Sequence, residues 1–340
     1  MAALLHRISA NAAPAARRIS TRRCFSTSSA NQAVWGFIGL GRMGLPMAKN
    51  LRAKLPKDDT LFVHDIDTNS SAKFLQATGA NGVVVAKSAR EVAEEAETII
   101  TALPEPHHVK SVYATMLIPP DLLSKGAAKE RLFIDVSTID PMTSLGVANA
   151  AHSSGQGKFV DAPMSGGVVG AEKGTLTFMV GAPPELIDRV REILSMMGKR
   201  VIHLGPASSG LKGKLANNYL LAINNIATAE AMNMGVQWGL DPTALADMIN
   251  SCTGKCWPSE VNNPVPGVVE GSPASRDYDG GFGVGLMKKD LGLALKGSHE
   301  AGIKLVLGEQ ARTIYDAVDE HPDCKGKDFS VVYRYLGGKE

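Results

Sequence analysis

Gly36-Phe37-Ile38-Gly39-Leu40-Gly41-Arg42-Met43-Gly44 is the stretch that decides the fold of this 340-residue chain. It places G-x-G-x-x-G between a short apolar run and a segment with helical spacing. There Gly39 permits a tight turn, Gly41 lets the backbone approach a pyrophosphate, and Gly44 allows close packing of helix on strand. A glycine turn without a nucleotide is the alternative. The predicted cofactor-binding turn consists of Gly39, Leu40, Gly41, Arg42, Met43 and Gly44.

Asp65 closes the second apolar run, 21 residues after Gly44. A carboxylate at this place accepts hydrogen bonds from the adenosine ribose hydroxyls and repels a 2′-phosphate. No Arg or Lys follows it closely, since the next residues are Ile66-Asp67-Thr68. The sequence therefore favours NAD over NADP as the cofactor.

Short apolar runs alternate with helical segments from residue 33 to residue 204. Strands are expected at 33–39, 60–66, 82–86, 97–103, 131–136, 158–161, 175–180 and 200–203. Helices are expected between them at 42–54, 68–78, 88–95, 106–116, 140–153 and 184–197. The alternation predicts an α/β, Rossmann-type doubly wound parallel sheet, covered by helices on both faces, as an NAD-binding domain over 33–204.

The pattern changes at Leu204-Gly205-Pro206, after which no good strand is found. Long helical segments are expected at 209–238, 242–251, 285–302 and 304–319. Residues 205–340 are therefore predicted to form an all-α domain. The Pro- and Gly-rich stretch 257–285 interrupts these helices and is either a functional loop or a surface excursion.

Three further segments carry polar groups that suit a binding site. Leu103-Pro104 and Ser137-Thr138 follow strands whose carboxyl ends should line the cofactor crevice, although ordinary turn chemistry explains them equally well. In Asp161-Ala162-Pro163-Met164-Ser165-Gly166-Gly167, the Ser165 hydroxyl and the amides of Gly166 and Gly167 can donate to a carboxylate. A flexible glycine-rich loop is the plain alternative.

Two lysines lie on predicted helices with apolar neighbours. Lys214 and Asn218 are four residues apart, so their side chains share one helix face. A partly desolvated lysine can exchange protons near neutral pH, whereas most helical lysines are solvated surface charges. Lys289-Asp290 interrupts an apolar helix, which indicates either a buried functional charge or a helix-capping ion pair.

Residues 1–30 differ from the rest in composition. They are rich in Ala, Ser and Arg and contain no Asp or Glu, and the first acid in the chain is Asp58. This is typical of a mitochondrial transit peptide, with a disordered basic tail as the alternative. Arg23-Cys24-Phe25-Ser26 resembles a matrix-processing site, so the mature chain is expected to begin near residues 26–29, in the mitochondrial matrix.

The remaining composition excludes several partner classes. No stretch reaches the ~18 uninterrupted apolar residues that a membrane span needs. The net charge of +2 gives no reason to expect nucleic acid or an anionic membrane surface as a partner. Cys252, Cys256 and Cys324 lack the Cys or His neighbours of a tetrahedral site, so free thiols and no metal are expected.

With these motifs in order, residues 34–336 resemble the β-hydroxyacid dehydrogenase family. The matching stretches are Gly36–Leu51, Phe133–Pro141, Asp161–Gly167, Gly210–Asn218 and Gly280–Ala294. Cys256-Trp257 and Asn262–Val268 are similar to the branch of that family that oxidises 3-hydroxyisobutyrate.

The resemblance implies an active site between a Rossmann domain and a helical domain that also forms a homodimer or homotetramer. It implies oxidation of (S)-3-hydroxyisobutyrate, a small β-hydroxy acid, to methylmalonate semialdehyde with NAD, a step of valine breakdown. By the matching motifs, Lys214 is the catalytic acid/base and Asn218 binds substrate. Ser165 and Gly166, with Gly167 beside them, would hold the substrate carboxylate. Thr138 and Lys289 would lie on the cofactor side.

Two departures from the family pattern and four rival functions remain. His108 stands where the family usually has an Asn that contacts NAD, and Met164 replaces a small aliphatic residue. The rivals are a glyoxylate or tartronate semialdehyde reductase, a silent NAD-binding scaffold, a lactate-dehydrogenase-like enzyme and a 6-phosphogluconate-type enzyme. Lys214 argues against the scaffold. His107 and His108 lie on the cofactor side, away from any substrate motif, and the helical domain is too small for the 6-phosphogluconate type.

Overall fold

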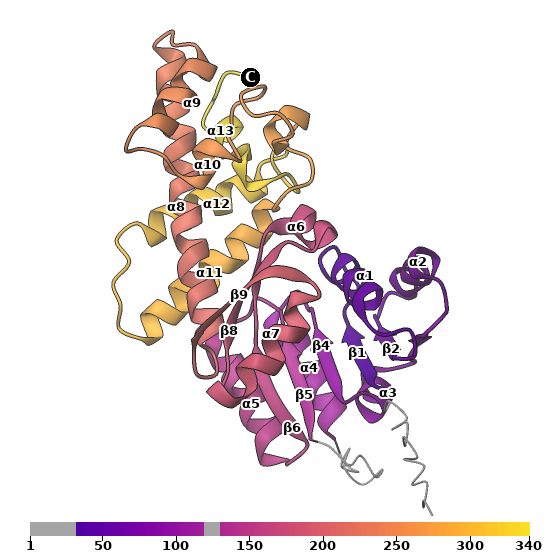
Figure 1. Cartoon of the computed structure of the whole chain (residues 1–340). Coiled ribbons are helices and arrows are strands. Elements are labelled where there is room, and N and C mark those ends of the chain that lie inside the picture. The colour runs from indigo at the N-terminus through magenta and orange to yellow at the C-terminus, as the bar shows by residue number, and fades with distance from the viewer. Residues whose placement is uncertain (1–31, 119–129) are drawn as a thin grey trace, which may run out of the picture. The chain divides into compact units, whose positions relative to one another are not determined.

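One sheet positions the other elements of the chain (Figure 1). The computed structural model describes residues 32–118 and 130–340. Its strand order is β3-β2-β1-β4-β5-β6-β8-β7, and β9 pairs with β8. The strands are β1 (Val34–Ile38), β2 (Thr60–His64), β3 (Val83–Val85), β4 (Thr98–Thr101), β5 (Arg131–Asp135), β6 (Gly157–Asp161), β7 (Met164–Ser165), β8 (Leu176–Gly181) and β9 (Gly198–Gly205).

From β3 to β6 every pairing is parallel, so the carboxyl ends of these strands meet at one edge. This is the order of dinucleotide-binding sheets, in which the strand order reverses between β1 and β4 and leaves a crevice at the carboxyl ends of these two strands. The predicted doubly wound fold class is confirmed.

The expectation of a wholly parallel sheet was wrong beyond β6. There β8 runs antiparallel to β6, with Asp161 opposite Gly181, and β7 runs antiparallel to β8. Residues 162–175, which join β6 to β8, are occupied by β7 and a seven-residue helix that the sequence did not indicate. No full crossover helix is left to bring β8 back parallel.

Helices cover both faces of the sheet, as predicted. One face carries α1 (Gly44–Lys54), α2 (Thr68–Thr78), α6 (Gly167–Lys173) and α7 (Ile187–Ser195), around a core that includes Phe37, Phe74 and Ile134. The other carries α3 (Ala89–Glu95), α4 (Pro106–Leu117) and α5 (Pro141–Ser153), around Ile99, Tyr113 and Phe133.

Several helices begin where a side chain caps them. Asp67 accepts from the amide of Asn69 at 3.0 Å, and Ser88 accepts from the amide of Glu91 at 3.1 Å. Asp140 accepts from the amide of Thr143 at 2.9 Å and directly precedes Pro141. Such caps satisfy amides that have no partner within the first turn of the helix. An Asp or Ser before a helical segment, or a Pro at its first position, therefore indicates in the sequence where a helix begins.

The chain after β9 is helical, as predicted. Its helices are α8 (Ser209–Gln237), α9 (Pro242–Ser251), α10 (Trp257–Glu260), α11 (Val284–Glu300), α12 (Gly308–Glu320) and α13 (Val332–Tyr335). They share a core that contains Tyr278, Tyr315 and Tyr333. Stretch 257–285 is not wholly irregular, because it includes α10 and a 3-10 turn at Pro273–Arg276. No helix in the described ranges combines the length and apolar character required to cross a lipid bilayer.

Helix α8 belongs to both parts of the fold (Figure 1). Leu211 in its first turn packs into the sheet core beside Tyr113 and Phe133. Ala222, Ile226, Ala229 and Met232 further along pack into the helical core. Residues 32–340 accordingly form one compact unit. The division between residues 204 and 205 stays a prediction, and the predicted transit peptide, residues 1–30, lies outside the described residues.

Candidate active site

The glycine turn after β1 has the three properties expected of it. Gly39 has φ of 97°, and a Cβ there would lie 2.3 Å from the carbonyl oxygen of Ala102. A Cβ at Gly44 would lie 1.8 Å from the carbonyl oxygen of Gly39. A Cβ at Gly41 would meet nothing within 4 Å. Two glycines are thus required by the turn itself, and the third leaves the open space that a pyrophosphate would need to approach the backbone.

Asp65 faces this turn from the end of β2. One carboxylate oxygen accepts from the amide of Leu40 at 2.5 Å, and the other accepts from the amide of Asp67 at 2.8 Å. Each oxygen retains a lone pair for a ribose hydroxyl. The residue that follows, Ile66, is 97% exposed and offers no charge to a 2′-phosphate. The donors and acceptors here fit the adenosine half of NAD.

The turns after β4 and β5 are joined to each other and to α11. The amide of Leu103 donates to the hydroxyl of Ser137 at 2.8 Å. The Lys289 ammonium donates to the carbonyl oxygen of Pro104 at 3.1 Å and to that of Thr138 at 2.8 Å. The structure therefore brings five residues from three separate motifs to one place at the strand ends.

A lysine cluster, defined as Lys214, Asn218, Lys289 and Asp290, joins α8 to α11. Lys214 is 8% exposed, and Asn218 lies one turn further along the same helix. The Asn218 amide donates to Asp290 at 2.6 Å. The other oxygen of Asp290 lies 3.2 Å from the Lys289 ammonium. The buried carboxylate of Asp290 thus contacts Lys289 and Asn218 directly and acts on Lys214 through its charge.

Burial lowers the pKa of Lys214 from its usual value. The Asp290 carboxylate opposes this by raising the pKa, and the Lys289 ammonium lowers it further. Desolvation disfavours the ammonium form, so a larger share of the side chain is neutral amine than on a surface lysine. Neutral amine is the form that accepts a proton from an alcohol.

Ser165 and the two glycines after it lie at the sheet edge. Ser165 is in β7 opposite Thr177, while Gly166 and Gly167 have φ of 133° and 62° and lead into α6. The Asn50 side chain of α1 holds α6 by donating to the carbonyl oxygens of Ala171 at 2.7 Å and Glu172 at 3.3 Å. The segment is therefore anchored to the helix of the glycine turn. Its carboxylate-binding role stays a prediction.

Asp161 holds the start of α8, a role that the sequence did not predict. It is fully buried at the end of β6, where its carboxylate accepts from the amides of Ser208 at 2.6 Å and Leu211 at 3.0 Å. Burial raises its pKa to about 6. The sequence shows an Asp at a strand end but nothing that links it to residues 47 positions later. Lys214 lies in the second turn of the helix whose start Asp161 holds.

The remaining predicted cofactor residues are exposed or half-buried. Arg42 is exposed and Met43 half-buried within the turn. His108 is exposed near the start of α4, with its ring centroid 3.9 Å from that of His107. Its contact with NAD stays a prediction. Within residues 32–118 and 130–340, no three His, Cys, Asp or Glu side chains are grouped in a way that would hold a metal ion.

Comparison with known proteins identifies the family. Residues 34–205 match the family described as the NAD binding domain of 6-phosphogluconate dehydrogenase, and residues 208–336 match the NAD-binding family of NADP-dependent 3-hydroxyisobutyrate dehydrogenase. The chain is 43% identical over 314 residues to a probable mitochondrial 3-hydroxyisobutyrate dehydrogenase of Dictyostelium discoideum, covering 92% of this chain and 93% of that protein. It is 42% identical over 315 residues to the mitochondrial enzyme of that name from Bos taurus, covering 93% and 90%.

The chain belongs to the 3-hydroxyisobutyrate dehydrogenase family. A solved member from Mycobacterium tuberculosis, with L-serine, superposes with a TM-score of 0.79 at 37% identity, covering 90% of this chain and 99% of that one. Members of the 3-hydroxyisobutyrate dehydrogenase family are oxidoreductases, so the predicted enzyme class and nicotinamide cofactor are confirmed. The preference for NAD over NADP rests on Asp65.

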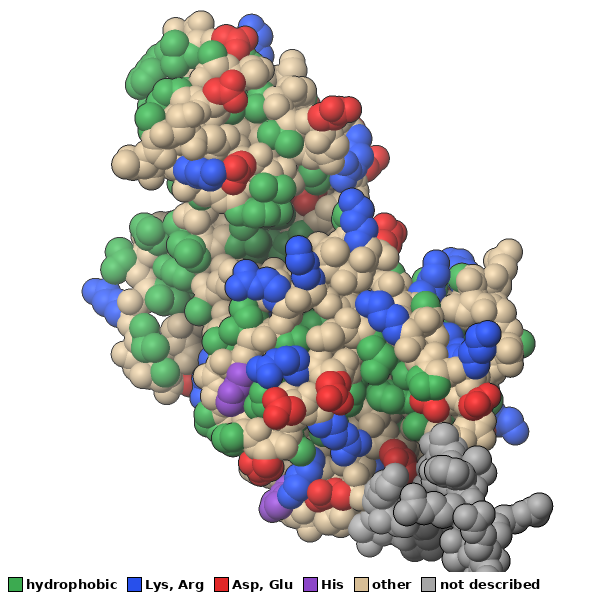
Figure 2. All heavy atoms as spheres, in the orientation of Figure 1, with side chains coloured by type: hydrophobic (Ala, Val, Ile, Leu, Met, Phe, Trp, Pro, Cys, Tyr) green, Lys and Arg blue, Asp and Glu red, His purple; other side chains and the backbone are tan. Residues whose placement is uncertain are grey.

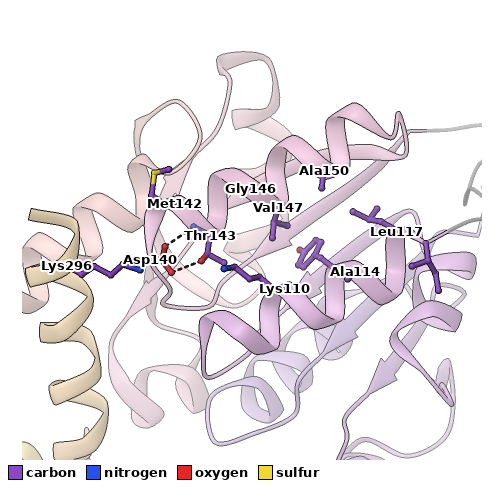
Figure 3. A pocket seen from close by; sticks show the side chains of 12 residues that line it. Lys110, Ala114, Leu117, Asp140, Met142, Thr143, Gly146, Val147, Ala150 and Lys296 are labelled. Carbon is purple, nitrogen blue, oxygen red and sulfur yellow. Dashed lines mark hydrogen bonds between the residues drawn. The ribbon is translucent and has the colours of Figure 1, made fainter. Parts of the chain in front are cut away.

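A separate groove lies between α4 and α5 (Figure 3). Its volume is about 690 Å³. Apolar side chains such as Val147 and Leu117 line its length, while Lys110 and Lys296 point toward Asp140 at one end (Figure 3). None of the predicted site residues lines this groove.

Proposed function

We propose that this protein oxidises (S)-3-hydroxyisobutyrate to methylmalonate semialdehyde with NAD, as a step of valine breakdown. The observation that carries the proposal is Lys214, a buried amine whose pKa is lowered by burial and by the charge of Lys289. Lys289 itself donates to the turns at the cofactor crevice. The names of the relatives support the substrate. The mycobacterial relative was solved with L-serine, which is itself a β-hydroxy acid.

The cofactor would be held along the carboxyl ends of β1, β2, β4 and β5. The glycine turn would hold the pyrophosphate and Asp65 the adenosine ribose. Leu103, Pro104, Thr138 and Lys289 would lie beside the nicotinamide half. When bound, NAD supplies the acceptor for the hydride that leaves the hydroxyl-bearing carbon.

The chain's own residues would handle the proton and orient the substrate. Lys214, as neutral amine, accepts the hydroxyl proton. One hydrogen of the Asn218 amide is committed to Asp290, which leaves the second free to donate to a substrate oxygen. The Ser165 hydroxyl and the amides of Gly166 and Gly167 would bind the carboxylate, so that the reacting carbon is held in one orientation.

A substrate panel tests this proposal. Protein beginning near residue 26 is assayed with both enantiomers of 3-hydroxyisobutyrate, L-serine, glycolate and glycerate, each with NAD and with NADP. We expect the highest kcat/KM for (S)-3-hydroxyisobutyrate with NAD. Higher kcat/KM for glycolate or glycerate would point instead to a glyoxylate or tartronate semialdehyde reductase. NAD binding without turnover of any substrate would indicate that the protein is a catalytically silent NAD-binding scaffold.

We also propose that the protein assembles as a homodimer or homotetramer through its helical part. Figure 2 shows hydrophobic side chains on the surface of that part. Trp238 at the end of α8 is 72% exposed, and large apolar side chains that gather in an exposed patch mark protein–protein contacts. Others nearby in the chain are Leu220, Met234, Leu240, Met248, Trp257 and Val261. Light scattering should show a dimer or tetramer in wild type and smaller species in Trp238→Glu; a wild-type monomer at micromolar concentration would contradict this.

We propose the mitochondrial matrix as the location. The support is the acid-free, arginine-rich composition of residues 1–30 and the mitochondrial names of the relatives. Residues 1–30 fused to a fluorescent protein should reach the matrix and be cleaved near residues 26–29. A version with the five arginines replaced by glutamine should remain in the cytosol, and equal import of both would contradict the assignment.

A further inference from the structure

Asp135 is a buried carboxylate for which the proposed mechanism has no use. It is the last residue of β5 and is 0% exposed. One of its oxygens accepts from the Thr101 hydroxyl at 2.8 Å and from the Ser137 hydroxyl at 2.5 Å. The other oxygen has no hydrogen-bond partner among the described residues. A charge-bearing group in such a place is costly, and burial raises the pKa of Asp135 to about 6.

The hydrogen bonds of Asp135 reach the cofactor crevice in two steps. Because the Ser137 hydroxyl donates its only proton to Asp135, its lone pairs remain to accept the Leu103 amide at 2.8 Å. The residues that follow, Pro104 and Thr138, present the two carbonyl oxygens that receive the Lys289 ammonium. One carboxylate therefore fixes both strand-end turns at the place where α11 meets the sheet.

We propose that Asp135 is a positioning residue for the nicotinamide side of the cofactor site. It holds the Ser137 hydroxyl as an acceptor for the Leu103 amide, and so sets the wall made by the turns after β4 and β5. The inference rests on the proposed place of the nicotinamide half beside these turns. It adds to that proposal the group that holds the turns in register.

A purely structural role for Asp135 makes a different prediction. The network has a second arm, in which the Thr101 hydroxyl lies 3.2 Å from the hydroxyl of Tyr113 in α4. This arm leads into the sheet core, where the Tyr113 ring packs against Phe133 and Phe159. If Asp135 only tied β4 to β5, removal of either the Ser137 hydroxyl or the Tyr113 hydroxyl would change NAD binding to the same extent. If it positions the turns, only the Ser137 arm affects the cofactor.

Four variants separate these roles: Ser137→Ala, Asp135→Ala, Asp135→Asn and Tyr113→Phe. Calorimetry without substrate gives the dissociation constants of NAD and of ADP, which lacks the nicotinamide half. We expect Ser137→Ala and Asp135→Ala to weaken NAD about tenfold and to leave ADP unchanged. Asp135→Asn retains an acceptor oxygen and should restore NAD binding to within about threefold. Tyr113→Phe should match wild type for both ligands.

Two results would overturn the inference. One is wild-type affinity for NAD in Ser137→Ala; the other is equal weakening of NAD and ADP in that variant. Should Asp135→Ala fail to fold, Ser137→Ala decides, because it removes a single oxygen atom. These constants are measured without substrate, so an error in the substrate or in the role of Lys214 leaves them unaffected.

Discussion

The glycine turn after β1 and the lysine cluster between α8 and α11 are built from different parts of the polypeptide. The turn is contiguous in sequence, uses backbone amides, and works because side chains are absent at Gly39, Gly41 and Gly44. The cluster contains a hydrogen bond between residues 72 positions apart and depends on buried side-chain charges. A binding site made of backbone amides therefore depends on the spacing of a few neighbouring residues. The protonation state of a charged side chain depends instead on the groups from distant segments that pack around it.

Removal of the amine should have the largest effect. Lys214→Ala should reduce kcat by about 10²–10⁴-fold, because the proton acceptor is lost, with little change in the dissociation constant for NAD. Steady-state kinetics and an NAD titration measure the two quantities. Lys212→Ala, on the same helix but exposed, is the matched control and should retain wild-type turnover. Retained turnover in Lys214→Ala would show that Lys214 is not the proton acceptor of the reaction.

Two alanine substitutions test the turn from within. Gly44→Ala forces a Cβ onto the carbonyl oxygen of Gly39 and should lower the free energy of unfolding by about 3 kcal/mol. Gly41→Ala has open space and should retain wild-type stability while weakening NAD about tenfold. Thermal unfolding and NAD titration separate the outcomes. Unchanged NAD affinity in Gly41→Ala would mean that no pyrophosphate approaches this backbone.

Cofactor choice tests the side chain that completes the turn. Asp65→Ser combined with Ile66→Arg replaces a repelling carboxylate with a cation, so kcat/KM for NADP relative to NAD should rise about tenfold or more. Ile66→Arg alone is the control, because Asp65 still opposes the phosphate. An unchanged ratio in the double variant would show that Asp65 does not face the ribose.

Opposed pH shifts test whether the cluster's charges act as described. Asp290 stabilises the Lys214 ammonium, so Asp290→Asn should lower the pKa of Lys214 and move the acid limb of the kcat profile to lower pH. Lys289 destabilises the ammonium, so Lys289→Met should move that limb to higher pH. Each shift should be about one pH unit or less. Shifts in the same direction would mean that other groups set the protonation of Lys214.

The same contrast explains what the sequence could reveal. The turn, Asp65 and most helices and strands follow from local spacing, caps and apolar runs, and the structure reproduces them. Lys214 and Asn218 were found because they are one helical turn apart. The roles of Asp161, Asp135 and Asp290 were not predicted, although Asp161 and Asp290 lie in stretches that the sequence singled out. The sequence around an aspartate does not show which distant group it contacts, such as Ser208 for Asp161 or Asn218 for Asp290. The antiparallel β8 was missed because strand direction depends on the connection before it, which contains the unexpected α6.

Helix α8 has a consequence for cooperativity. Its first turn is part of the sheet core and its later turns are part of the helical core, so neither half can melt without withdrawing apolar contacts from the other. A chain that stopped at residue 204 would also lose both amide donors of Asp161, so that this carboxylate would have to be solvated or left without those hydrogen bonds. The dinucleotide-binding half is thus not a detachable module, and the protein should lose its structure in one transition on heating.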